Sequence, residues 1–234
     1  MELTKRQIQI LDWIIKDYID LVRPISSELI ERRHKTEISS PMIRIEMQKL
    51  TEKGYIKKPH ASAGRIPTDK GYRFFVDRTM KKLREREIKI EEWMEEIIQD
   101  AIRLTHLLTR YLAKETEAFV FGYLKEKEIL FKEGWQVLKE PEFKDKDLTS
   151  KFLKFVIEFE NRIKKLKDEC EIKIFIGKEI PIRGGGEFSL LVSECSLPKR
   201  KESLFALLGP KRMNYIKNIS LLNSLKKFLE SLKE

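Results

Sequence analysis

The side chains best suited to a chemical task form a basic run between Lys57 and Arg73. Five Lys and Arg against one Asp give this run a net charge of +4. It follows Ser39-Ser40-Pro41, a sequence typical of a helix N-terminus, where free backbone N–H groups and the helix dipole favour an anion. Lys and Arg beside such a terminus bind phosphate and release counterions. The pattern therefore predicts contact with the phosphates of a nucleic acid.

Groups of residues typical of catalysis or metal binding are missing from the sequence. The three histidines stand apart, and Cys170 and Cys195 lie 25 positions apart without CxxC spacing, so we interpret both thiols as small buried side chains. The glycine-rich segment Arg183-Gly184-Gly185-Gly186-Glu187 lacks the Lys-Ser/Thr of a P-loop, which favours a hairpin turn. We therefore expect a protein that is not an enzyme and holds no cofactor or metal.

The composition favours a negatively charged partner. The 234 residues carry a net charge of +10, and 37% of them are charged, against about 25% in ordinary proteins. Nucleic acid or an acidic membrane surface would match this charge, although a lysine-rich proteome would also produce it. No apolar run reaches the length of a membrane helix, about 18 residues, and the N-terminus has no apolar leader segment. We expect a cytoplasmic protein with one large domain or two small ones.

Two helices are predicted at the start of the chain. Thr4 and Gln7 have the spacing of a capping box and begin the first helix, which the dipeptide Arg23-Pro24 ends. Ser26 or Ser27 then caps a short second helix.

A third helix and a β-loop complete the N-terminal region. We place Ser40 at the N-cap, Pro41 at the first helical position and Gly54 just beyond the last turn. Residues 55–58 then have the pattern of a short strand, and residues 59–68 are small, polar and rich in turn formers. Three helices followed by a basic β-loop are typical of a winged helix-turn-helix.

A single long helix is predicted from Val76 to Tyr111. Its apolar residues alternate by four and three, a heptad pattern with one polar interruption at Glu87. Such a helix either packs on a neighbouring domain of the same chain or pairs with a second chain, and the regular rhythm slightly favours the second interpretation. The expected centre of the dimer contact is Ile90, Met94, Ile97 and Leu104.

The remainder of the chain has an α+β pattern. We predict two helices, one with an apolar stripe from Leu148 to Leu166 and one at the C-terminus. The predicted strands are Ala118–Leu124 and Glu128–Lys132, which pair as a hairpin, then Glu171–Ile176, Phe188–Val192 and Ser203–Leu208.

Several segments together resemble the HrcA family of heat-inducible transcription repressors. In the N-terminal region these are Ser39-Ser40, the run Ile43–Met47 and, most specifically, Pro59–Arg73. Towards the C-terminus, Leu208–Tyr215 is similar to the family's G-P-x-R-M-x-Y. Two shorter matches are Ile176-Gly177-Lys178-Glu179, similar to I-G-x-E, and Pro141-Glu142-Phe143, similar to P-E-F.

The resemblance implies an α+β protein with an N-terminal winged helix-turn-helix, a connector helix and a C-terminal GAF-like domain. We place these parts at residues 1–76, 77–114 and 115–234. The sequence departs from the family at Ile45 and Ile180, where Asn is usual. It is also much shorter than typical members, because the family's inserted dimerising domain is missing between Leu124 and Ile129.

The family's function gives the leading hypothesis. A homodimer would bind double-stranded DNA at an inverted-repeat operator of the CIRCE type and repress the dnaK and groE chaperone operons, and the GroE chaperonin would help keep it active. Because Ile45 and the missing insert depart from the family, a second hypothesis is a ligand-sensing or protein-interaction module whose winged helix no longer reads that operator. Equal affinity for an inverted-repeat and a scrambled duplex would favour this second hypothesis.

The expected DNA contacts lie in the third helix and the loop. Arg44 either reads guanine or forms a surface ion pair, and Ile45 either touches a thymine methyl or leaves a base unread. His60 is interpreted as a hydrogen-bonding residue of the loop rather than a metal ligand. Small residues such as Gly64 let the backbone approach a phosphate, and Arg65 contacts a phosphate or the minor groove. The full set is Ser39, Ser40, Met42, Arg44, Ile45, Lys57, Lys58, His60, Ser62, Gly64, Arg65, Thr68, Lys70 and Arg73.

Overall fold

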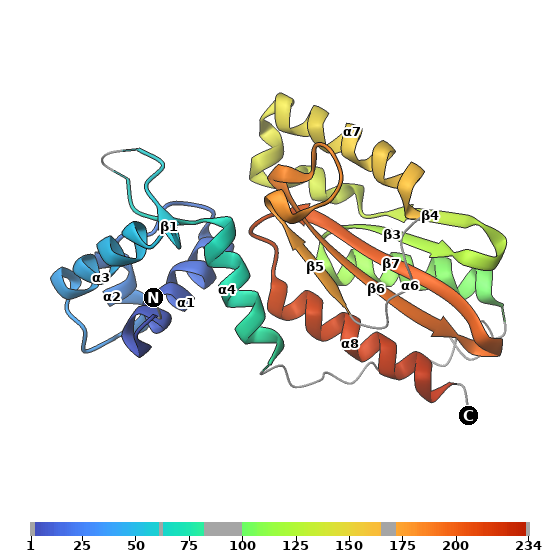
Figure 1. Ribbon diagram of the computed structural model, residues 1–234, viewed down its shortest axis with the longest axis horizontal. Coiled ribbons are helices and arrows are strands. Elements are labelled where there is room, and N and C mark those ends of the chain that lie inside the picture. The colour runs from blue at the N-terminus through green and yellow to red at the C-terminus, as the bar shows by residue number, and fades with distance from the viewer. Residues whose placement is uncertain (1–2, 61–62, 82–99, 165–171, 233–234) are drawn as a thin grey trace. The chain divides into compact units, whose positions relative to one another are not determined.

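The computed structural model describes residues 3–60, 63–81, 100–164 and 172–232 of a mixed α and β chain. The chain divides into two compact units, Met1–Lys81 and Lys82–Glu234, called here the first and second unit (Figure 1). Within the described ranges, no helix has the length and apolarity that crossing a membrane requires.

The first unit is a helical cluster with a two-stranded antiparallel sheet. Its apolar core includes Ile10, Ile14, Ile43 and Leu50, all fully buried. The predicted capping box of Thr4 and the side-chain cap of the second helix are both present. The elements are α1 (Lys5–Leu21), α2 (Ser27–His34), α3 (Ser40–Glu52), β1 (Ile56–Lys57), β2 (Ile66–Pro67) and α4 (Asp69–Met80).

Two boundaries in the first unit differ from the prediction. The N-cap of α3 is Ser39 rather than Ser40, because the backbone is still extended at Ser39 and helical from the next residue. The last helix begins at Asp69, well before the predicted start at Val76, because the Thr68 side chain accepts a hydrogen bond from the backbone N–H of Gly71 and caps it. Gly54 has the positive φ of +76° expected just beyond a helix end.

The second unit is a five-stranded antiparallel sheet in the order β4-β3-β7-β6-β5, with helices on both faces (Figure 1). The predicted hairpin is confirmed, since Leu124 pairs directly with Ile129. The elements are α6 (Ala101–Thr116), β3 (Phe119–Leu124), β4 (Ile129–Glu133), α7 (Lys146–Ile163), β5 (Lys173–Ile176), β6 (Phe188–Leu197), β7 (Lys201–Pro210) and α8 (Tyr215–Ser231), with short 3-10 helices between them.

Alternate strand residues supply the two faces of this sheet. One face packs on α7 through a phenylalanine-rich core that includes Phe121, Phe159 and Phe188. The other face packs on α6 and α8, where Ser189 and Tyr215 join their hydroxyls at 2.6 Å.

The single helix predicted from Val76 to Tyr111 is wrong. Asp100 has an extended backbone, with φ −104° and ψ 99°, and its carboxylate accepts hydrogen bonds from the N–H groups of Ile102 and Arg103. A new helix, α6, therefore starts at Ala101, because a capping aspartate satisfies N–H groups that a continuous helix would have paired internally.

The dimer contact predicted along that helix is also corrected in part. Leu104 is fully buried and belongs to α6, which packs on β3, β4 and β7 of its own chain. Leu104 is therefore a core residue of the second unit. The other three predicted contacts, Ile90, Met94 and Ile97, lie outside the described residues.

Two segments that carried the family resemblance meet in the second unit. Arg212, from the segment after β7, donates from Nε to one oxygen of Glu142 at 2.5 Å and from Nη2 to the other at 3.0 Å. Nη2 also donates to Glu140. Because Arg212 is only 9% exposed, this contact ties the two segments together inside the unit.

Candidate nucleic-acid interface

The outward face of α3 carries apolar and basic side chains that lie outside the core of the first unit. Met42 is 39% exposed and Ile45 is 51% exposed, while the Arg44 side chain between them is 69% exposed. The opposite face packs inward through Ile43, which is fully buried, and its neighbours one and two turns later. An exposed apolar pair beside an arginine suits contact with bases, whose edges offer both methyl groups and acceptors.

The two serines at the start of α3 have different environments. Ser39 is exposed and its side chain makes no capping hydrogen bond. Ser40 is buried, and its hydroxyl donates to the hydroxyl of Ser27 at 2.9 Å. The prediction that Ser40 contacts DNA is therefore corrected, because its side chain joins α3 to α2.

The end of β1 and the start of the loop after it present basic residues to solvent. Lys57, Lys58 and His60 are exposed, as the prediction requires, whereas Ser62 lies outside the described residues. Gly64 has a role within the chain, because a Cβ there would lie 2.4 Å from the carbonyl oxygen of Ile25. The glycine lets the returning strand approach Ile25, which gives it a structural role, and its contact with a phosphate stays a prediction.

Arg65 does not point into solvent as predicted. It is 8% exposed, and its backbone forms an antiparallel bridge with Ile25. Its guanidinium donates from Nε to the hydroxyl of Thr51 at 3.0 Å and from Nη2 to the side-chain oxygen of Gln48 at 3.4 Å. Burial lowers the pKa of this guanidinium. Arg65 therefore positions the loop against α3 rather than presenting its charge to a groove.

The last three predicted contacts lie at the start of α4 and make contacts within the chain. Thr68 caps α4. Lys70 lies 4.5 Å from the ring centre of Tyr55 and donates to a backbone carbonyl at 2.8 Å. Arg73 is half-buried and pairs with Asp77 at 3.4 Å. These partners explain the three side chains structurally and bring none of them to the outward face of α3.

A hollow of about 410 Å³ lies between the start of α2, the side of α3 and the loop. Four charged residues line it: Glu28 from α2, Arg44 from α3, and Lys58 and Arg65 from the loop. Three of these four side chains are cations and one is a carboxylate, so the net charge of the walls is positive.

Glu28 is the residue of this region that the sequence analysis missed. Its carboxylate accepts from Arg44 Nη2 at 2.5 Å, and its side chain is 49% exposed. A hydrogen bond from its own backbone N–H and one from Ser26 lower its pKa to about 2, with smaller contributions from Arg44. The only available signal was an acid in the first turn after a serine cap, which is common in helices generally.

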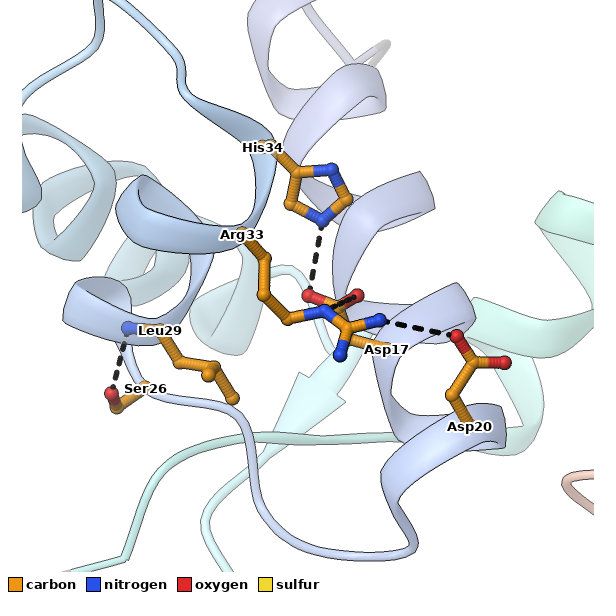
Figure 2. Close-up of polar contacts among 6 residues, drawn as sticks. All are labelled: Asp17, Asp20, Ser26, Leu29, Arg33 and His34. Carbon is orange, nitrogen blue, oxygen red and sulfur yellow. Dashed lines mark hydrogen bonds and ion pairs between the residues drawn. The ribbon is translucent and has the colours of Figure 1, made fainter.

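A buried carboxylate fixes α2 beneath this region. Asp17 of α1 is 1% exposed and binds Arg33 at 2.9 Å and His34 at 3.0 Å, both from the last turn of α2 (Figure 2). Trp13 stacks on the His34 ring with centroids 4.7 Å apart. These contacts anchor the end of α2 opposite to Glu28. No group of His, Cys, Asp or Glu suited to a metal occurs among the described residues.

A family model and several curated relatives name the same family. The family described as "HrcA protein C terminal domain" matches residues 72–219. The "Heat-inducible transcription repressor HrcA" of Acetivibrio thermocellus is 49% identical over 92 residues, which are 39% of this chain and 25% of that protein. Its namesake from Thermobifida fusca is 41% identical over 120 residues, 47% of this chain and 35% of that protein.

A solved structure shares the fold over the whole chain. It is described only as a hypothetical protein at 2.2 Å resolution, and it aligns with a TM-score of 0.74 and 21% identity over 98% of both chains. By contrast, this chain spans only 25–40% of the curated relatives it matches.

Proposed function

Because this chain belongs to the HrcA family, we propose that its first unit is a winged helix-turn-helix that binds double-stranded DNA and that the protein represses transcription. The observation that carries the proposal is the outward face of α3. Met42 and Ile45 are exposed beside Arg44 on a helix whose other face is fully packed. Two large apolar side chains exposed beside an arginine on one helix face suit an interaction surface.

The proposed geometry places α3 in the major groove, which admits an α-helix. Arg44 would read a guanine through two hydrogen bonds, and Ile45 would touch a thymine methyl group. Lys57 and Lys58 lie on the neighbouring strand and loop, where their exposure suits contact with the phosphates that flank the groove.

An inverted-repeat operator requires two copies of α3, one for each half-site. We therefore propose that the protein acts as a homodimer, whose contact surface does not include Leu104. From the family we also carry over, as proposals, a GAF-like second unit, a CIRCE-type operator, chaperone operons as targets and GroE as a partner.

The test compares two duplexes of equal length and composition, one carrying the inverted repeat and one scrambled. We expect affinity for the inverted repeat to exceed affinity for the scrambled duplex by about 10³ or more at near-physiological salt. As a matched pair, Arg44→Ala should reduce this ratio, whereas Lys16→Ala, which removes the same charge from the exposed side of α1, should not.

Equal affinities for the two duplexes would contradict the proposal. They would favour the rival hypothesis, a ligand-sensing or protein-interaction module, for which the exposed Ile45 offers an apolar contact without reading a base.

A further inference from the structure

The inference concerns the carboxylate that faces the proposed DNA surface, and it rests on the proposed function. Glu28 is the one acid among the residues that line the hollow, opposite Arg44, Lys58 and Arg65. An acid at a phosphate-binding surface opposes binding, because like charges repel. The position of Glu28 beside the exposed Arg44 therefore suggests a contribution other than affinity for DNA.

The contact with Arg44 limits where that arginine can point. The two side chains meet at 2.5 Å although they lie 16 residues apart on different helices, and Glu28 accepts from a single guanidinium nitrogen, Nη2. A guanidinium has five N–H donors, so Arg44 keeps enough of them for a guanine while one is held. Without Glu28, the flexible side chain is free to turn to the nearest phosphate instead.

The turn of α2 that carries Glu28 has a side-chain cap. The Ser26 hydroxyl accepts from the N–H of Leu29 at 3.2 Å and caps the turn that contains Glu28 (Figure 2). With a pKa of about 2, Glu28 is ionised throughout the physiological range.

We infer that Glu28 is a specificity-determining residue: it directs Arg44 towards the bases and disfavours phosphate in the hollow, so that it weakens binding to random DNA more than binding to the operator. Non-specific binding depends on phosphate contacts, whereas specific binding also draws on base contacts. The fixed negative charge of Glu28 beside the hollow therefore weakens non-specific binding more than specific binding. The first effect acts through Arg44 and the second is direct repulsion of phosphate, so Glu28 needs no base contact of its own.

The experiment measures Kd for the inverted-repeat and scrambled duplexes at several salt concentrations, using the full chain. Glu28→Gln should bind the scrambled duplex about fivefold more tightly and lower the ratio of the two affinities. Its salt dependence on scrambled DNA should steepen by about one unit, since one more phosphate is neutralised. Glu52→Gln is the matched control: it removes the same charge from an exposed position near the end of α3 and should shift both affinities equally.

Two further variants make the test decisive. In an Arg44→Ala background there is no arginine for Glu28 to direct. Glu28→Gln should therefore lower the ratio of the two affinities by less than it does in the wild-type background. Glu28→Asp keeps the charge but shortens the reach to Arg44, so it should keep random binding weak while lowering operator affinity. Circular dichroism checks that each variant is folded, which we expect because the Glu28 side chain is half exposed.

The outcomes separate this inference from the proposed function. A wild-type protein that does not discriminate between the duplexes contradicts the proposed function itself. A discriminating wild type, with Glu28→Gln behaving like Glu52→Gln, overturns the inference alone. An undiminished effect of Glu28→Gln in the Arg44→Ala background likewise overturns it, because Arg44 would not be the residue through which Glu28 acts.

Discussion

Arg65 and Thr51 are joined by a hydrogen bond of 3.0 Å from the guanidinium Nε to the hydroxyl oxygen, across 14 residues of sequence. The Thr51 hydroxyl in turn donates a hydrogen bond to the carbonyl oxygen of Met47 at 2.8 Å, one turn earlier in α3. The loop that returns through Arg65 is therefore bonded to the same helix that presents Arg44. The orientation of the loop relative to the proposed recognition helix depends on this contact.

We expect Arg65→Ala to destabilise the first unit by about 1–3 kcal/mol, because it removes a buried side chain together with its hydrogen bonds to Thr51 and Gln48. Affinity should fall on both duplexes, since the loop loses its position. Urea unfolding and DNA binding measure the two effects. Lys57→Ala, at an exposed position, should instead reduce the salt dependence by about one unit with no change in stability. If Arg65→Ala behaved like Lys57→Ala, Arg65 would be a phosphate contact after all.

Arg44→Ala should leave stability within about 0.5 kcal/mol of wild type, because a largely exposed ion pair contributes little. Its affinity for the inverted repeat should fall by about 1–3 kcal/mol, with a smaller loss on scrambled DNA. Titration of both duplexes by fluorescence anisotropy gives the difference. A uniform loss on the two duplexes would make Arg44 a phosphate contact.

The sequence predicted well what local patterns decide. The capping box at Thr4, the hairpin closed by Leu124 and Ile129, and the helix with its stripe from Leu148 all depend on spacing within one segment. The strands of the second unit place successive side chains on two faces that are both covered. The strands are therefore apolar runs in the sequence, which made them predictable.

The remaining features depend on contacts between distant segments. From the sequence alone, Arg65 is interpreted as an exposed basic residue in a loop. Its burial becomes evident only from its contact with Thr51 in the structure. Ser40 is likewise interpreted as a helix cap from the sequence, whereas in the structure its hydroxyl donates a hydrogen bond to that of Ser27. At Asp100 the apolar heptad continued on both sides, so periodicity alone hid the break that a capping carboxylate makes. Glu28 was missed for the same reason, since its partner lies on another helix.

Asp17→Asn should destabilise the first unit by about 1.5–3 kcal/mol. The substitution keeps the size of the side chain but removes the charge that pairs with Arg33 and His34 in a buried setting. Asp20→Asn is the matched control, because its side chain is 59% exposed and its contact with Arg33 is 3.3 Å long, so a change within about 0.5 kcal/mol is expected. Both are visible in Figure 2.

Fluorescence of Trp13, which stacks on His34, reports this unfolding in a background where the other two tryptophans are replaced by Phe. Equal effects of Asp17→Asn and Asp20→Asn would show that burial of Asp17 adds nothing to the pair.

Glu46 should make the first unit sensitive to acid. Burial raises its pKa, but hydrogen bonds from Gln7 and Lys49 together lower it below the ordinary value. A carboxylate whose pKa is lower in the folded state stabilises the protein above the unfolded pKa, about 4.3, and loses that contribution as pH falls through the folded pKa. Wild type should therefore exceed Glu46→Gln in stability at about pH 7, with the gap narrowing as pH falls below the unfolded pKa of about 4.3. A gap of constant size across this range would contradict the assignment.

Arg212→Leu should destabilise the second unit by about 3–5 kcal/mol. The substitution removes the donor that Glu140 and Glu142 share and leaves two poorly exposed carboxylates side by side. Urea unfolding followed by Trp135, which packs on Phe119 in this unit, measures the loss. Arg162→Leu is the matched control, because its ion pair with Glu158 is about half exposed and contributes at most about 1 kcal/mol.

A second substitution identifies the cause of that loss. If the penalty comes from unpaired charge, Arg212→Leu combined with Glu142→Gln should recover part of the stability, because one of the two repelling carboxylates is gone. Glu142→Gln alone should destabilise, since Arg212 is then left with one charged partner. If Arg212→Leu destabilised the protein no more than Arg162→Leu does, the contact between the two segments would contribute no more to stability than a surface ion pair.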